Sequence, residues 1–288
     1  LMFKGTSEFG TLDWEKEKPL LDKIEALFEV YRKETDPAKR AAIYHQIDSI
    51  SYIASTLAIP NEYDRLMTAI GSTGTNAGTS NDYTIYMENI PSNQLRNWAM
   101  IQAQRFNDAT IRLFHTELET VYEEKNMSLT NDGRQASEAL MQGLFPNHPY
   151  GLQTTLGEAE HLKNPSIINI KNFFKKYYVP NNMAVVMSGD FDPDEAIRVI
   201  DEHFGQLKPS PVDPLRFGRQ PEITQPIIKE VIGLQAENIQ IGWRFEGANS
   251  DQIPYLNMIG MILSNRRAGL IDQNLNKQQA TLGAGAYI

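Results

Sequence analysis

The segment that organises the rest of the chain is His115–Arg134, with the sequence HTELETVYEEKNMSLTNDGR. It has no Gly or Pro before its penultimate residue and is rich in helix-forming residues, so we predict a helix over His115–Leu129. Glu117 and Glu124 lie seven residues apart, which is about two helical turns, so both carboxylates project from one side. Two acids on a partly apolar stripe are candidate metal ligands, although a Glu-rich helix is more often a solvated surface.

The first residues of the chain give this pair of acids a context. Leu1–Thr6, LMFKGT, resembles the segment that follows the inverted zinc motif His-x-x-Glu-His in insulysin/pitrilysin-type (insulinase family) metallopeptidases. The resemblance implies that two His of that motif and Glu124 bind zinc, that the motif's Glu is the general base, and that Glu117 supports a His ligand. The chain begins with Leu1 instead of Met, so we expect the motif to lie immediately before it.

The composition is typical of a globular protein, since 41% of the 288 residues are hydrophobic and 22% are charged. The net charge is −9 and no basic cluster stands out, which makes nucleic acid and anionic membranes poor partners. No apolar run reaches the roughly 18 residues of a membrane span. There is no Cys, which excludes disulfides and a Cys nucleophile within these residues. The compartment stays open, with the periplasm among the alternatives.

Asp13–Pro60 has the pattern of a self-contained helical hairpin. Apolar residues recur at helical spacing on both sides of Thr35-Asp36-Pro37, and Asp36 is a candidate N-cap. Pro19 suits the first turn of the first helix. An insertion here would lengthen the spacing between the zinc motif and Glu124 relative to the family pattern. Its role is open: a structural decoration, or a wall or lid of a substrate chamber.

A Gly- and Thr-rich segment precedes the strand that we predict after Tyr83. The sequence by itself is compatible with an ordinary β-hairpin. Asn76, Ala77 and Gly78 resemble the family's Gly-x-x-Asn-Ala-x-Thr edge strand, which implies that they bind a peptide substrate as an added strand. Small residues on such an edge leave N–H and C=O groups that an extended peptide can pair with.

The second half of the chain alternates helical and strand patterns. We predict an apolar, buried strand at Ala184–Ser188, flanked by helices, in an order that resembles the family's first homologous unit. Pro209–Pro226 contains five prolines and predicts an extended linker. Strand-forming residues follow in Ile227–Phe245, and another strand is expected in Ala280–Ile288.

We therefore predict an α+β fold with two lobes, each a mainly antiparallel sheet with helices packed on one face, plus the inserted helical hairpin. The first lobe spans residues 1–208, with the insertion at about 13–60. Residues 209–226 form the linker, and residues 227–288 begin the second lobe.

The function that the resemblance implies is zinc-dependent hydrolysis of peptide bonds in unfolded peptides or small proteins. A second homologous half or subunit would complete the chamber around the peptide substrate. Without the motif's two His and general base, the chain as given is expected to bind zinc weakly, if at all, and to be inactive. Two alternatives stay open: a non-catalytic homologous half that acts as a scaffold, and a peptide-binding module that uses only the Asn76-Ala77 edge.

Overall fold

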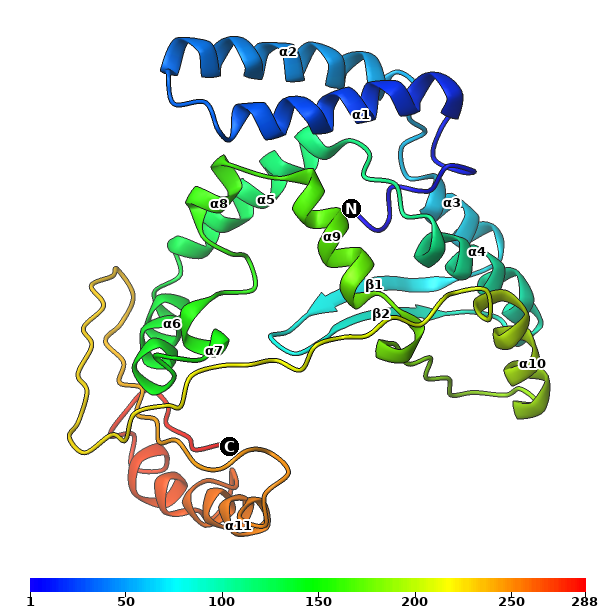
Figure 1. Cartoon of the computed structure of the whole chain (residues 1–288). Helices are drawn as coiled ribbons and strands as arrows, with labels where there is room; N and C mark the ends of the chain where they lie inside the picture. The colour runs from blue at the N-terminus through cyan, green and yellow to red at the C-terminus, as the bar shows by residue number, and fades with distance from the viewer. The chain divides into compact units, whose positions relative to one another are not determined.

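The computed structural model describes residues 1–288 and separates into two compact units, Leu1–Asn238 and Ile239–Ile288 (Figure 1). The larger unit contains ten α-helices and one small sheet, and the smaller unit contains α11 and a short π-helix. The α-helices are α1 (Trp14–Tyr31), α2 (Pro37–Ser55), α3 (Glu62–Ala69), α4 (Leu95–Asn107), α5 (Phe114–Leu129), α6 (Asp132–Leu144), α7 (Pro149–Leu152), α8 (Ala159–Lys163), α9 (Ile167–Tyr177), α10 (Pro193–Phe204) and α11 (Ile253–Leu263). The strands are β1 (Thr73–Thr79) and β2 (Thr84–Asn89), the 3-10 turns are η1 (Ser92–Gln94) and η2 (Pro180–Asn182), and the π-helix is η3 (Asp272–Asn276). Within residues 1–288, no helix is both long enough and apolar enough to span a membrane.

Helices α1 and α2 form the predicted antiparallel hairpin (Figure 1). The Asp13 carboxylate accepts a hydrogen bond from the Lys16 amide at 3.2 Å, and Asp36 accepts one from the Lys39 amide at 2.9 Å. Asp36 is thus confirmed as an N-cap, which satisfies amides that a helix start leaves unpaired. The prediction for Pro19 was wrong: the helix begins at Trp14, because Asp13 caps it, so Pro19 lies inside the helix, beyond its first turn.

The main hydrophobic core joins this hairpin to later helices. Phe28 of α1 and Ile47 of α2 are fully buried, and they share one cluster with Phe114 of α5 and Ile167 of α9. A second cluster joins α4 to α10. Because the first cluster includes the start of α5, the hairpin and the helix with the two candidate acids form one packing unit.

The sheet is a single antiparallel pair, as predicted for a β-hairpin. Asn76 lies opposite Met87 and Ala77 opposite Tyr86, with an irregularity between Thr73 and Asn76. Each strand pairs only with the other, so the far edge of β1 is open.

Two larger sheets are not present in this structure, which is rich in helices and has one small sheet. The prediction of a buried strand at Ala184–Ser188 was wrong, since the segment is neither helix nor strand and Val186 is 90% exposed. Ile227–Phe245 and Ala280–Ile288 also form no strand. A strand is stable only when a neighbour pairs with its N–H and C=O groups, and these segments have no such neighbour here. Residues 209–226 contain no helix or strand.

Candidate functional site

Helix α5 carries both candidate acids, and the structure confirms the helix predicted over His115–Leu129. It begins at Phe114, which is buried, and its N-cap is Leu113 in the left-handed region, with φ 54° and ψ 33°. A bulky residue is rarely found in this conformation, so the entry to α5 is a strained point that surrounding contacts must stabilise.

Glu117 lies in the first turn of α5 and contacts the first residues of the chain. Its carboxylate pairs with the Lys4 Nζ at 2.8 Å and lies 3.7 Å from the Leu1 nitrogen, and its side chain is 27% exposed. These residues are far apart in the sequence, so only the fold brings them together. The LMFK segment and the helix with the two acids are therefore adjacent.

Glu124 lies about two turns further along α5, and its side chain is exposed. No group of three or more His, Cys, Asp or Glu side chains in residues 1–288 is arranged to bind a metal ion. A catalytic zinc takes about three protein ligands, and a Glu oxygen is one of the accepted types. The exposed Glu124 carboxylate could supply one such oxygen, and its role as a metal ligand stays a prediction.

Asn76, Ala77 and Gly78 lie in β1, a separate element from α5. The Ala77 amide donates to the Asn76 Oδ1 at 2.8 Å, and the edge of β1 that faces away from β2 is open. The Ala77 amide would have to leave Asn76 to pair with an added strand, and the binding of a peptide by Asn76, Ala77 and Gly78 stays a prediction.

Two of the five histidines, His115 and His148, have local structural partners. His148 is largely buried, and its Nδ1 accepts a hydrogen bond from the Tyr150 amide at 3.2 Å, so it caps α7. The His115 Nε2 lies 3.4 Å from Glu119 and 3.8 Å from Asp48 of α2. Neither is grouped with a second His.

Sequence reasoning missed one buried ion pair near the site. Arg112, two residues before α5, donates from Nε and Nη2 to the two Glu17 carboxylate oxygens at 2.6 and 2.8 Å. The Arg112 side chain is 1% exposed and the Glu17 side chain is 0% exposed. Each residue resembles an ordinary surface charge in the sequence, and nothing in their spacing indicates that they pair.

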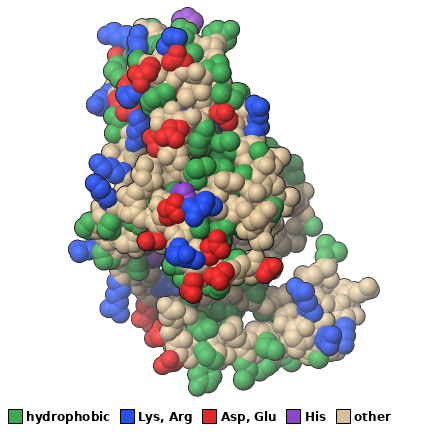
Figure 2. Space-filling view, turned by 90° about the vertical axis from the view of Figure 1, so that its right-hand side faces the viewer, with side chains coloured by type: hydrophobic (Ala, Val, Ile, Leu, Met, Phe, Trp, Pro, Cys, Tyr) green, Lys and Arg blue, Asp and Glu red, His purple; other side chains and the backbone are tan.

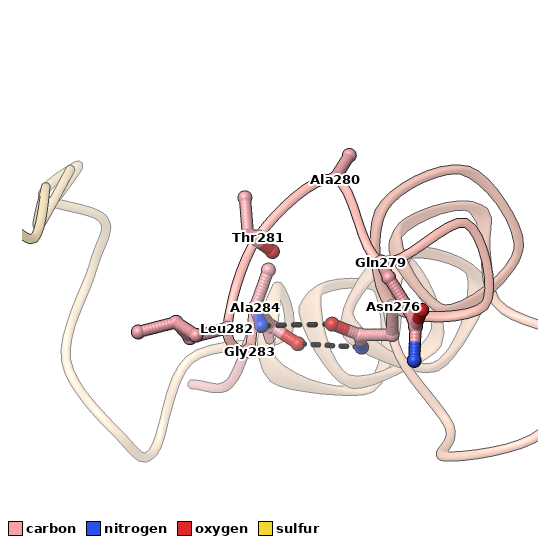
Figure 3. Close-up of a pocket in the computed structure, with 7 residues that line it drawn as sticks. All are labelled: Asn276, Gln279, Ala280, Thr281, Leu282, Gly283 and Ala284. Carbon is pink, nitrogen blue, oxygen red and sulfur yellow. Dashed lines mark hydrogen bonds between the residues drawn. The ribbon is translucent and has the colours of Figure 1, made fainter.

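A pocket in the smaller unit is a poorer candidate (Figure 3). It contains no side chain that could act as an acid, a base or a charged ligand, being lined by Asn276, Gln279, Ala280, Thr281, Leu282, Gly283 and Ala284. Figure 3 shows the Asn276 side chain in two hydrogen bonds with the Ala284 backbone, at 2.8 and 2.9 Å. These bonds satisfy the Asn276 amide internally.

On the face shown in Figure 2, basic and acidic side chains are mixed. This face therefore has no continuous basic patch of the kind that binds nucleic acid.

Comparisons with known proteins show similarity to one family of peptidases. Residues 168–288 match the family described as "Peptidase M16 inactive domain". The chain is 23% identical over 188 residues to the "Zinc protease PqqE" of Helicobacter pylori, covering 64% of this chain and 42% of that protein. It is 25% identical over 142 residues to the "Probable zinc protease PqqL" of Escherichia coli K12, covering 46% of this chain and 15% of that protein. Residues 168–288 are thus similar to the peptidase M16 family, in agreement with the resemblance to insulinase-type peptidases that the sequence shows.

Part of the fold is similar to that of a solved structure. "The crystal structure of a protease from Helicobacter pylori" matches with a TM-score of 0.50 and 23% identity, over 54% of this chain and 38% of that one. The chain spans less than half the length of the two curated relatives named above. Glu117 and Glu124 lie outside the part that matches the inactive domain.

Proposed function

We propose that the intact protein is a zinc-dependent endopeptidase that hydrolyses unfolded peptides or small proteins, with Glu124 as a metal ligand. The observation that carries the proposal is the contact between Lys4 and Glu117, 2.8 Å apart, which brings the LMFKGT segment beside α5. The names of the relatives as zinc proteases support the same reaction class.

The residues of this chain take three roles in the proposal. Glu124 supplies one carboxylate ligand, and Glu117 orients the segment that provides the His ligands. The open edge of β1 at Asn76, Ala77 and Gly78 pairs with the extended substrate. Zinc, when bound, polarises the scissile carbonyl and lowers the pKa of water. The two His and the general-base Glu would come from a His-x-x-Glu-His motif before Leu1.

The partner in this proposal is a second homologous half or subunit that completes the chamber around the peptide. The exposed apolar side chains of Ala184–Ser188 and Ile227–Phe245 are suited to burial against such a half. Residues 1–208 would belong to the first lobe and residues 227–288 to the second.

A non-catalytic subunit is the second candidate, because the matching family model describes an inactive domain. A peptide-binding module that uses only the β1 edge is a weaker third candidate. The five residues before Leu1 discriminate between them: His-x-x-Glu-His supports the enzyme, and any other sequence there supports a scaffold or a binding module.

The test of the metal role is Glu124→Gln in the full-length protein. We expect zinc affinity and the rate of peptide hydrolysis to fall together by more than about 100-fold. Loss of a residue that binds the metal directly should cost more than loss of a residue that only orients a ligand. Glu117→Gln should cost about 10- to 100-fold, in keeping with an orienting role. Glu123→Gln is the matched control, because Glu123 is an exposed neighbour on the same helix. Zinc content by elemental analysis beside peptide hydrolysis measures both effects, and a fully active Glu124→Gln protein would refute the assignment.

A further inference from the structure

The α1–α2 hairpin is linked to the candidate metal helix by a series of polar contacts that passes through the first residues of the chain. The series begins at the buried Glu17 of α1, which binds Arg112 through both carboxylate oxygens. Arg112 also donates from Nη1 to the Lys4 carbonyl at 2.7 Å and from Nη2 to the Thr6 carbonyl at 3.0 Å. The flat guanidinium, with donors in a fixed fork, can reach all three partners at once.

The same network continues from Lys4 to α5. While the Lys4 carbonyl accepts from Arg112, its Nζ pairs with Glu117 at 2.8 Å. The loop around Arg112 depends on two glycines with positive φ, Gly5 at +97° and Gly10 at +87°. A Cβ added to Gly5 would lie 2.9 Å from the Arg112 Nη1, and one added to Gly10 would lie 2.7 Å from it. The segment next to Leu1 is therefore fixed against Arg112 by close packing as well as by hydrogen bonds.

The hairpin also fixes the strained entry to α5. Leu113, with φ 54°, lies between Arg112, which Glu17 binds, and Phe114, whose ring meets that of Phe28 edge-on at 5.2 Å. His115 then contacts Tyr44 of α2, with ring centroids 5.4 Å apart. An unfavourable backbone conformation persists only when its surroundings over-determine it, and here α1 and α2 supply those contacts. Figure 1 shows the start of α5 beneath the hairpin.

We propose that the α1–α2 hairpin positions the metal centre, and that Glu17 and Arg112 are the positioning residues through which it acts. The inference rests on the function proposed above and assigns a role to the insertion beyond decoration. Glu17 aligns Arg112, and Arg112 fixes both the LMFKGT segment and the first turn of α5. The segment next to the His-x-x-Glu-His motif and the helix that carries Glu124 are thereby held in a fixed position relative to each other.

The experiment compares Glu17→Gln with Glu15→Gln in the full-length protein. Glu15 is exposed and lies two residues away on the same helix, so the control has the same chemistry without the buried partner. We expect Glu17→Gln to lower zinc affinity and kcat by about 10- to 100-fold, the range for outer-shell partners, with KM unchanged. Glu15→Gln should match the wild type. Zinc affinity is measured by competition with a chelator at a temperature at which each variant is folded.

A second readout does not depend on zinc or activity. The Glu117 amide donates to the Leu113 carbonyl at 3.1 Å in the first turn of α5. We expect Glu17→Gln to increase hydrogen exchange in this turn and in residues 4–6 of the metal-free protein. If Glu17→Gln does not fold, Arg112→Lys decides by the same measurements, because Lys keeps the charge but cannot bind the carboxylate and both carbonyls together.

The result that would overturn the proposal is a variant with a lower melting temperature but wild-type zinc affinity, kcat and hydrogen exchange in α5. The hairpin would then only support the fold. Failure of the proposed function is distinguishable: a wild-type full-length protein without zinc would refute the metal role. Hydrogen exchange would still test whether Glu17 and Arg112 fix the entry to α5.

Discussion

Two buried arginines in the larger unit have opposite surroundings. Arg112 has a bidentate carboxylate and two carbonyls as partners. Arg105 is also fully buried, but its guanidinium nitrogens have no hydrogen-bond partner and it lies among aromatic rings, 4.6 to 5.2 Å from the ring centroids of Phe3, Tyr63, Tyr86 and Phe106. Burial lowers the pKa of Arg105 from its usual value. Cation–π contacts offset only part of the cost of burying a charge.

This difference predicts opposite outcomes for the same substitution. Arg112→Met leaves the Glu17 carboxylate buried and unpaired, so we expect it to lower the free energy of unfolding by about 3–5 kcal/mol. Arg105→Met removes a buried charge that lacks hydrogen bonds. The free energy of unfolding of this variant should therefore lie within about 1 kcal/mol of the wild-type value or exceed it. Urea denaturation followed by circular dichroism measures both, and equal losses for the two variants would contradict the contrast.

Among the secondary-structure elements, the hairpin depends on its apolar contact with α5. Phe28 is fully buried and packs against Phe114, so Phe28→Ala should lower the free energy of unfolding by about 3–5 kcal/mol through lost burial and a cavity. Tyr52 on α2 is 73% exposed, and Tyr52→Ala should change stability by no more than about 0.5 kcal/mol. A Phe28→Ala protein as stable as the Tyr52→Ala control would show that the cluster is not a shared core.

The open edge of β1 gives a second prediction for an element. Ala77→Pro removes one backbone donor at a position where an edge strand tolerates proline. Losing one main-chain hydrogen bond, worth about 0.5–1.5 kcal/mol, should lower kcat/KM for a peptide by about 2- to 12-fold. Zinc content should not change. Ala77→Ser keeps the donor and is the control, and equal kinetics for both variants in the full-length enzyme would exclude the substrate-edge role.

For the whole molecule, the proposal predicts a difference between this chain and the intact protein. We expect residues 1–288 to bind zinc weakly and not to cleave peptides, because Glu124 is one ligand where about three are needed. The absence of the general base should lower the rate of hydrolysis by a further factor of about 10²–10⁴. Elemental analysis and peptide hydrolysis on both proteins provide the measurement. Stoichiometric zinc in residues 1–288 would show that the site is misassigned.

The sequence by itself determined the elements whose stabilising interactions are local. The helix over His115–Leu129, the N-cap at Asp36 and the β-hairpin around Asn76 follow from spacing, capping and turn residues within a few positions. The prediction for Ala184–Ser188 was wrong because strand formation requires a partner that a local pattern does not reveal.

Only the tertiary structure decided which distant residues meet. Lys4 contacts Glu117, and Glu17 binds Arg112, across separations that carry no periodicity and no motif. Whether a charge is solvated or buried depends on how helices pack, so Glu17 and the exposed Glu15 are indistinguishable in the sequence. Packing of the hairpin core against Phe114 is the physical reason that Arg112 is excluded from water and must find its partners inside the protein.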